Sequence, residues 1–138
     1  MPANDPRRGE VWLVQLDPTR GMEIRKTRPA VVVSADVYAA IPLRIIVPTT
    51  SWQPRFASWP YMIPIPQSPA NGLTRDSCAN VLQVRSVALE RLTKRLGVVT
   101  DDQLRLIVAG VVLSIDYLPP QAPSAPQAPP DSGKPNVP

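Results

Sequence analysis

The chain has 138 residues, enough for one domain with a single core, and it contains one cysteine and no histidine. This composition excludes an intrachain disulfide, a four-cysteine zinc site, and chemistry that uses histidine as a base or as a metal or haem ligand. The formal net charge of +4 favours an acidic partner, such as nucleic acid or an acidic protein segment.

The first third of the chain is predicted to form two strands joined by a long loop. Apolar residues alternate in residues 9–18 until Asp17-Pro18, which is typical of a strand that enters a turn. Residues 19–27 carry charges without either periodicity, so we expect a loop, and a loop this long in a small β-domain is a candidate for function. Residues 28–36 then contain an unbroken apolar run that predicts a strand buried on both faces, with Pro29 tolerated near its start.

Further strand signals follow. Residues 43–51 (LRIIVPTTS) are predicted as a third strand that ends in a cluster of hydroxyls. Prolines spaced through residues 59–66 (WPYMIPIP) would delete hydrogen bonds from a central strand, so this segment is predicted at an edge. Residues 77–87 and 95–99 complete the expected set of strands.

A helix is predicted to follow the last strand. Thr100 and Gln103 have the spacing of a capping box. Apolar residues then recur at intervals of three or four as one stripe: Leu104, Ile107, Val108, Val111, Ile115 and Leu118. Gly110 within it costs about 1 kcal/mol relative to alanine, which suggests a close backbone approach. The expected fold is therefore mainly β with a C-terminal helix (α+β), a small and partly open β-barrel packed by that helix.

The domain is expected to occupy residues 1–118. Residues 119–138 contain eight of the nineteen prolines and almost no large apolar side chain, so we predict a disordered, proline-rich tail. This tail is either a solvated extension or a ligand for proline-recognising domains, and we expect its deletion to leave fold and activity unchanged. With no signal-peptide-like or membrane-spanning apolar run, the protein is expected to be soluble and cytoplasmic.

Polar residues gather at strand ends and in the long loop, whereas P-loop, dinucleotide, HExxH and GxSxG signatures are absent from the sequence. The set is Glu23, Arg25, Lys26, Arg28, Thr49, Thr50 and Ser51. If their strands run antiparallel, Arg28 lies beside Thr50. An arginine, hydroxyls and a carboxylate suit metal-free RNA cleavage by the substrate's own 2′-hydroxyl, with Glu23 as the base and Arg28 stabilising charge. The alternative is that Arg28 merely caps a sheet edge.

The motifs RGE, DPTxGxE and RPxVVxS, in this order within residues 8–34, resemble those of the MazF/PemK/Kid toxins of bacterial toxin–antitoxin pairs. The resemblance continues through residues 45–51 and 76–87 to the terminal helix. It implies an SH3-like or CcdB-like barrel that acts as a homodimer and needs no cofactor. The implied activity is sequence-selective, metal-independent cleavage of single-stranded RNA, leaving 2′,3′-cyclic phosphate and 5′-hydroxyl ends. The implied inhibitor is a cognate antitoxin with an extended, acidic tail.

Within this resemblance, Arg28 and Thr50 match the catalytic arginine and threonine, and Glu23 matches the loop acid. The predicted RNA-binding residues are Ser51, Thr49, Arg25, Lys26, Arg55, Gln83 and Arg85. Where the Kid branch has a loop histidine and an Arg-x-Asp pair, this chain has Met22, Asn80 and Leu82. The Kid mechanism therefore does not carry over whole, and we expect catalysis to depend on Arg28 and Thr50.

Two alternatives remain open. A non-enzymatic toxin on the same barrel, resembling CcdB, would act by protein contact with gyrase and would have no need of the RP and V-P-T-T elements. The second concerns Trp52, Phe56 and Trp59, which either stack on unpaired bases or pack in the core. For Trp12 we predict core packing.

Overall fold

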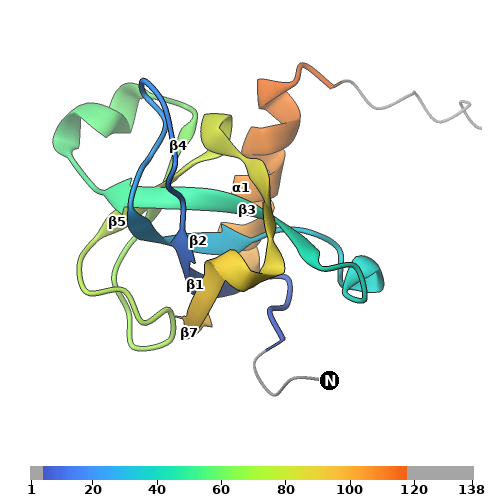
Figure 1. Ribbon diagram of the computed structural model, residues 1–138. Helices are drawn as coiled ribbons and strands as arrows, with labels where there is room; N and C mark the ends of the chain where they lie inside the picture. The colour runs from blue at the N-terminus through green and yellow to red at the C-terminus, as the bar shows by residue number, and fades with distance from the viewer. Residues whose placement is uncertain (1–4, 118–138) are drawn as a thin grey trace, which may run out of the picture.

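The computed structural model describes residues 5–117, in which seven antiparallel strands form one curled sheet (Figure 1). The strands are β1 (Glu10–Gln15), β2 (Thr27–Val32), β3 (Leu43–Ser51), β4 (Met62–Ile65), β5 (Ser77–Asn80), β6 (Arg85–Ala88) and β7 (Leu92–Val98). Their order is β4-β5-β3-β2-β1-β7, and β6 pairs with β3 outside this path. In this part of the chain β4 and β7 end the path without pairing to each other, so the predicted partly open barrel is confirmed.

Both faces of the central strands β1 and β2 are buried, which confirms the prediction that the unbroken apolar run of residues 28–36 made for β2. On one face Val11 of β1 and Val31 of β2 join the larger core cluster, which also contains Ile107 of the helix. On the other face Trp12, with 1% of its surface exposed, packs with Ala30 in a second cluster. The prediction that Trp12 is a core residue is confirmed, and the two-sided burial holds β1 and β2 rigidly in place.

Strand β3 is the longest element of the sheet, and it has the bounds that the sequence predicts. Its first half pairs with β6, from Leu43 opposite Ala88, and its last three residues pair with β5. The proline-containing β4 pairs only with β5, which confirms its edge position. The hydroxyls that end β3 therefore lie where the sheet curls.

The segment predicted as one strand over residues 77–87 is instead two strands separated by a short 3-10 helix, η3 (Val81–Gln83). The Asn80 side chain accepts a hydrogen bond from the Leu82 amide at 3.1 Å, and the Val84 amide donates to the Val81 carbonyl. This turn allows β5 and β6 to pair with opposite ends of β3, so a continuous strand was the wrong prediction. The last strand also begins earlier than predicted, at Leu92.

Helix α1 (Asp101–Ser114) packs against η3 and β4, behind the sheet in Figure 1, and begins with the predicted capping box between Thr100 and Gln103. A Cβ placed on Gly110 would lie 3.1 Å from Val81 Cγ1, so the predicted close approach is confirmed. The apolar stripe is shorter than predicted, because Ile115 caps the helix with 68% of its surface exposed.

Leu118 and the predicted tail at residues 119–138 lie outside the described residues. Within the part that the structure describes, no helix is long and apolar enough to cross a membrane.

Candidate functional site

Arg28 and Thr50 are brought together by the pairing of β2 with β3. The two strands run antiparallel, as expected, with Ala30 opposite Pro48. Arg28 precedes Ala30 by two residues and Thr50 follows Pro48 by two, so both lie at the same end of the two strands, just beyond their last pair. The Thr49 hydroxyl donates a 2.7 Å hydrogen bond to the Pro29 carbonyl and ties the two strands at this end. Both candidate catalytic residues therefore stand on a fixed two-stranded base.

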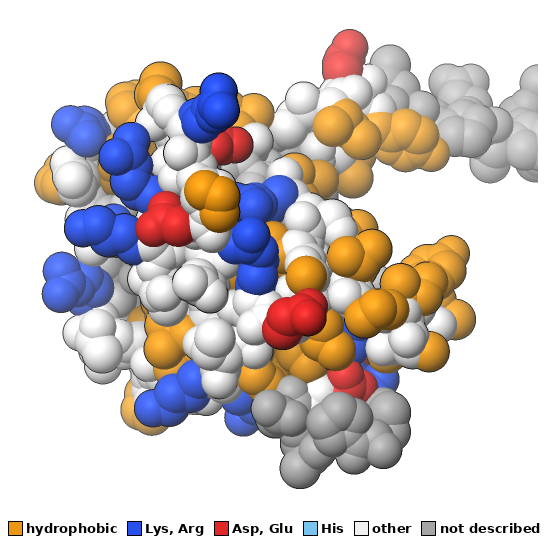
Figure 2. All heavy atoms as spheres, viewed as in Figure 1, with side chains coloured by type: hydrophobic (Ala, Val, Ile, Leu, Met, Phe, Trp, Pro, Cys, Tyr) orange, Lys and Arg blue, Asp and Glu red, His pale blue; other side chains and the backbone are white. Residues whose placement is uncertain are grey.

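These two residues face a cavity of about 310 Å³. Its lining comprises Lys26, Thr27, Arg28, Pro29, Thr49, Thr50, Ser51, Leu73, Thr74, Arg75 and Ser77. The described lining thus contains cations and hydroxyls but no carboxylate. Figure 2 shows Lys and Arg side chains gathered around the β1–β2 loop on the left of the view, with few acidic side chains among them. Such a lining favours an anionic group, and guanidinium and hydroxyl donors match phosphate oxygens.

Within this cavity, the guanidinium of Arg28 is hydrogen-bonded to protein through its Nε atom. Its Nε donates to the Arg25 carbonyl at 3.3 Å, and among residues 5–117 no hydrogen-bond partner lies within reach of its two terminal nitrogens. Thr50 and Ser51 are half-buried. The Thr49 side chain, in contrast, is 2% exposed and its hydroxyl is engaged by Pro29, so its geometry suits fixing the strands rather than meeting RNA.

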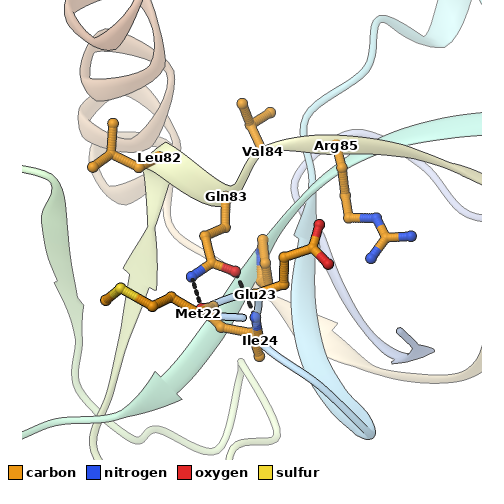
Figure 3. A pocket seen from close by; sticks show the side chains of 8 residues that line it. Met22, Glu23, Ile24, Leu82, Gln83, Val84 and Arg85 are labelled. Atoms are coloured by element: carbon orange, nitrogen blue, oxygen red, sulfur yellow. Dashed lines mark hydrogen bonds between the residues drawn. The ribbon is translucent and has the colours of Figure 1, made fainter. Parts of the chain in front are cut away.

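Glu23 lines a second cavity, of about 490 Å³ (Figure 3). The lining residues are Met22, Glu23, Ile24, Pro48, Leu82, Gln83, Val84 and Arg85. Pro48 lines this cavity and Thr50 lines the other, and because residues two apart on a strand lie on the same face, the two cavities adjoin on one face of β3. The structure therefore groups Arg28 with Thr50 but places Glu23 with Gln83 and Arg85.

The side-chain amide of Gln83 is bonded to the β1–β2 loop, residues 16–26. Its Oε1 accepts a hydrogen bond from the Ile24 amide at 2.6 Å, and its Nε2 donates to the Met22 carbonyl at 2.9 Å (Figure 3). We expected this side chain to contact RNA, and here it contacts protein. Nothing in the sequence signals this contact, because about sixty residues separate the partners.

Arg25 and Arg55 line neither cavity. Arg25 donates to the Gly21 carbonyl at 3.1 Å within its own loop. The guanidinium of Arg55 lies 5.2 Å from the centre of the Phe56 ring and 5.8 Å from that of Trp59, where cation–π attraction holds it. Phe56 is buried, with Trp52 and Trp59 half-buried against it, which favours the core-packing alternative for Phe56.

Three hydroxyl residues of the first cavity, Thr27, Thr74 and Ser77, were absent from the predicted site. The last two reach it because the segment before β5 folds back onto the end of β3, where the Trp52 amide donates to the Asp76 carbonyl at 3.0 Å. Local sequence patterns carry no signal for such a tertiary contact.

The three positions that differ from the Kid branch do not rebuild an acid–base group in this structure. Met22 and Leu82 are exposed at the rim of the second cavity, and the Asn80 side chain is buried and bonded to the Leu82 amide. Glu23 is consequently the only carboxylate among the described residues that line either cavity.

The sequence matches a protein-family model and a known relative. Residues 7–115 match a family model described as a PemK-like, MazF-like toxin of type II toxin–antitoxin systems. Endoribonuclease MazF9 of Mycobacterium tuberculosis (strain ATCC 25618 / H37Rv) is 37% identical over 116 residues, which cover 80% of this chain and 96% of that protein.

Solved structures show the same fold at lower identity. A MazF from Deinococcus radiodurans matches with a TM-score of 0.70 and 19% identity, covering 81% of this chain and 97% of that one. An endoribonuclease from a mycobacterial species, solved in complex with its cognate antitoxin, matches with a TM-score of 0.63 and 18% identity, covering 82% and 97% respectively.

Proposed function

This chain belongs to the PemK-like, MazF-like toxin family of type II toxin–antitoxin systems, and we propose that it is an endoribonuclease that cleaves single-stranded RNA without a metal ion. The observation that carries the proposal is the meeting of Arg28 and Thr50 in one cavity lined by cations and hydroxyls. A phosphate held there would be gripped by donors whose positions two paired strands fix in advance. Such preorganised donors stabilise the charge that develops during phosphoryl transfer.

In the proposed reaction, the 2′-oxygen of the substrate attacks the adjacent phosphorus, and the bond from phosphorus to the 5′-oxygen of the next nucleotide breaks. The products are a 2′,3′-cyclic phosphate and a 5′-hydroxyl. Arg28 stabilises negative charge on the phosphate oxygens, and the hydroxyls of Thr50 and Ser51 donate to the same group. Arginine stays protonated in proteins, so Arg28 is unsuited to accept the proton of the 2′-hydroxyl.

We assign proton acceptance to Glu23, because no other carboxylate lines either cavity among the described residues. The two cavities adjoin at Pro48 and Thr50, so an extended RNA strand could place its phosphate in one and a neighbouring base in the other. Lys26 lines the first cavity and Arg85 the second, and both would bind phosphates. Contacts in the second cavity would supply sequence selectivity.

The proposed partners follow from the charge of the site. An extended, acidic antitoxin tail would compete with RNA for the same cations, and a structural neighbour was solved with its cognate antitoxin. We also propose that the active form is a homodimer in the bacterial cytoplasm.

The experiment is incubation of the purified protein with a single-stranded RNA pool in excess EDTA. We expect the wild type to cleave RNA and Arg28→Ala to lose cleavage. Arg105→Ala is the control, because it removes an arginine of α1 whose side chain is 79% exposed, and it should cleave as the wild type does. Intact RNA with the wild type would contradict the enzyme and favour a CcdB-like toxin that acts through gyrase.

A further inference from the structure

The β1–β2 loop, which carries Glu23, is largely exposed but is tied at its base. The Leu16 amide donates to the Lys26 carbonyl at 2.9 Å, and Arg91 donates to the carbonyls of Gln15 and Asp17. Beyond this base Ile24 packs half-buried against the second core cluster, and the hydrogen bonds within the loop are short-range, such as that from the Arg20 amide to the Glu23 carboxylate. Local turns of this kind shape a loop but do not fix it to the rest of the domain.

Gln83 supplies a long-range hydrogen-bonded attachment of this loop to the domain. Among the described residues it is the only one outside the loop that hydrogen-bonds to residues 18–24. Its amide grips the Met22 carbonyl and the Ile24 amide, the two backbone groups on either side of Glu23 (Figure 3). One side chain thus pairs with the loop as a neighbouring strand would, and it fixes the backbone on both sides of the carboxylate.

The support beneath Gln83 is itself rigid. Gln83 is the last residue of η3, whose first turn is capped by the Asn80 side chain. Val81 of the same turn is fully buried against Gly110 of α1, and its amide donates to the Tyr61 carbonyl at 3.0 Å. Because η3 is fixed to the core, the Gln83 side chain can restrain the exposed loop to which it is hydrogen-bonded.

We propose that Gln83 is a positioning residue, which locks the β1–β2 loop so that Glu23 is held toward the substrate. This inference rests on the proposed function for its catalytic consequence, but the lock itself is a property of the free protein. Gln83 therefore acts on RNA cleavage through Glu23 and not by reading a base.

The lock is tested first without RNA, by hydrogen exchange of the Ile24 amide. Gln83→Met keeps the length of the side chain and removes both hydrogen bonds, and we expect Ile24 to exchange about tenfold faster. Gln67→Met, which changes an exposed glutamine after β4, is the matched control and should leave this rate unchanged. Unchanged exchange in Gln83→Met would overturn the proposal, whether or not the protein cleaves RNA.

The catalytic consequence is tested by a double-mutant cycle under single-turnover conditions. We expect Gln83→Met to slow cleavage by about 10- to 100-fold with an unchanged melting temperature, since small misplacements of reacting groups cost this much. In a Glu23→Gln background the same substitution should have almost no further effect. An equal loss in both backgrounds would mean that Gln83 contacts RNA directly and would overturn the proposal.

A conservative variant separates the two hydrogen bonds. Gln83→Glu retains an acceptor for the Ile24 amide but, when ionised, loses the donor to the Met22 carbonyl. We expect its Ile24 exchange rate and its cleavage rate both to lie between those of the wild type and Gln83→Met. A Gln83→Glu protein that matches Gln83→Met in both measurements would contradict the assigned contacts. If the wild type leaves RNA intact, the proposed function fails while the exchange result still stands.

Discussion

The two halves of the candidate site are built in different ways. Arg28 and Thr50 stand on paired strands with two-sided burial close by, so their positions follow from the packing of the sheet. Glu23 stands on an exposed loop that is attached to the domain beyond its base by the amide of Gln83 and by the packing of Ile24 against the second core cluster. The contrast suggests a division of labour in which the strands stabilise charge and the loop handles the proton.

The largest expected effect lies on the strands. Replacing Arg28 by alanine should lower the cleavage rate by about 10³-fold, because a preorganised donor to the charged phosphate is lost. Arg28→Lys should recover little of this, since a lysine cannot make two parallel hydrogen bonds to one phosphate. Single-turnover cleavage of one defined RNA gives both numbers. Full activity in Arg28→Ala would show that Arg28 does not stabilise charge in the reaction, and the role proposed for the strands would be wrong.

A smaller effect is expected on the loop. Glu23→Gln should slow cleavage by about 10²-fold, at the lower end for loss of a general base. The substitution keeps the shape of the side chain, so RNA binding measured in the Arg28→Ala background should not change. A loss larger than that of Arg28→Ala would mean that the loop, and not the strands, dominates catalysis.

Thr50 offers a finer test of the strand half. Thr50→Val removes the hydroxyl while keeping a β-branched side chain, and we expect about a tenfold slower reaction from one lost hydrogen bond to a charged group. Thr50→Ser keeps the hydroxyl and serves as the control. Equal rates for the valine and serine variants would show that the hydroxyl has no part in the reaction.

The smallest effect concerns the support beneath the loop. Gly110→Ala improves helix propensity, yet the new Cβ would lie 3.1 Å and 3.2 Å from the two methyl carbons of Val81, which is fully buried. We expect a net loss of about 1 kcal/mol in the free energy of unfolding, since overpacking a buried contact outweighs the propensity gain. Denaturant unfolding measures it, and a more stable Gly110→Ala protein would contradict this packing.

The burial of Cys78 in the core leads to a further prediction. Burial raises the pKa of its thiol, which donates a hydrogen bond to the Thr50 carbonyl. Because the thiolate is the reactive form, Cys78 should resist alkylation in the folded protein at neutral pH and react after unfolding. Rapid alkylation of the native protein would show that the core around Cys78, which pairs with Thr50 across the sheet, opens to solvent.

Much of the strand half of the site could be predicted from the sequence, because it depends on local patterns. The apolar run after Pro29 and the hydroxyls that end β3 are visible in the chain, and antiparallel pairing then joins Arg28 to Thr50. The loop half could not be predicted in this way. The turn at η3 depends on the Asn80 side chain, and the contact of Gln83 with Ile24 depends on tertiary folding, so neither follows from periodicity.

The central claim, that the phosphate held by Arg28 and Thr50 is attacked by the substrate's own 2′-hydroxyl, has one direct test. After the cleavage position has been mapped in EDTA, an RNA with a single 2′-deoxy nucleotide on the 5′ side of that bond is compared with the unmodified RNA. We predict that the unmodified RNA yields a 2′,3′-cyclic phosphate and that the substituted RNA stays intact at that bond. Cleavage of both at similar rates would contradict the account.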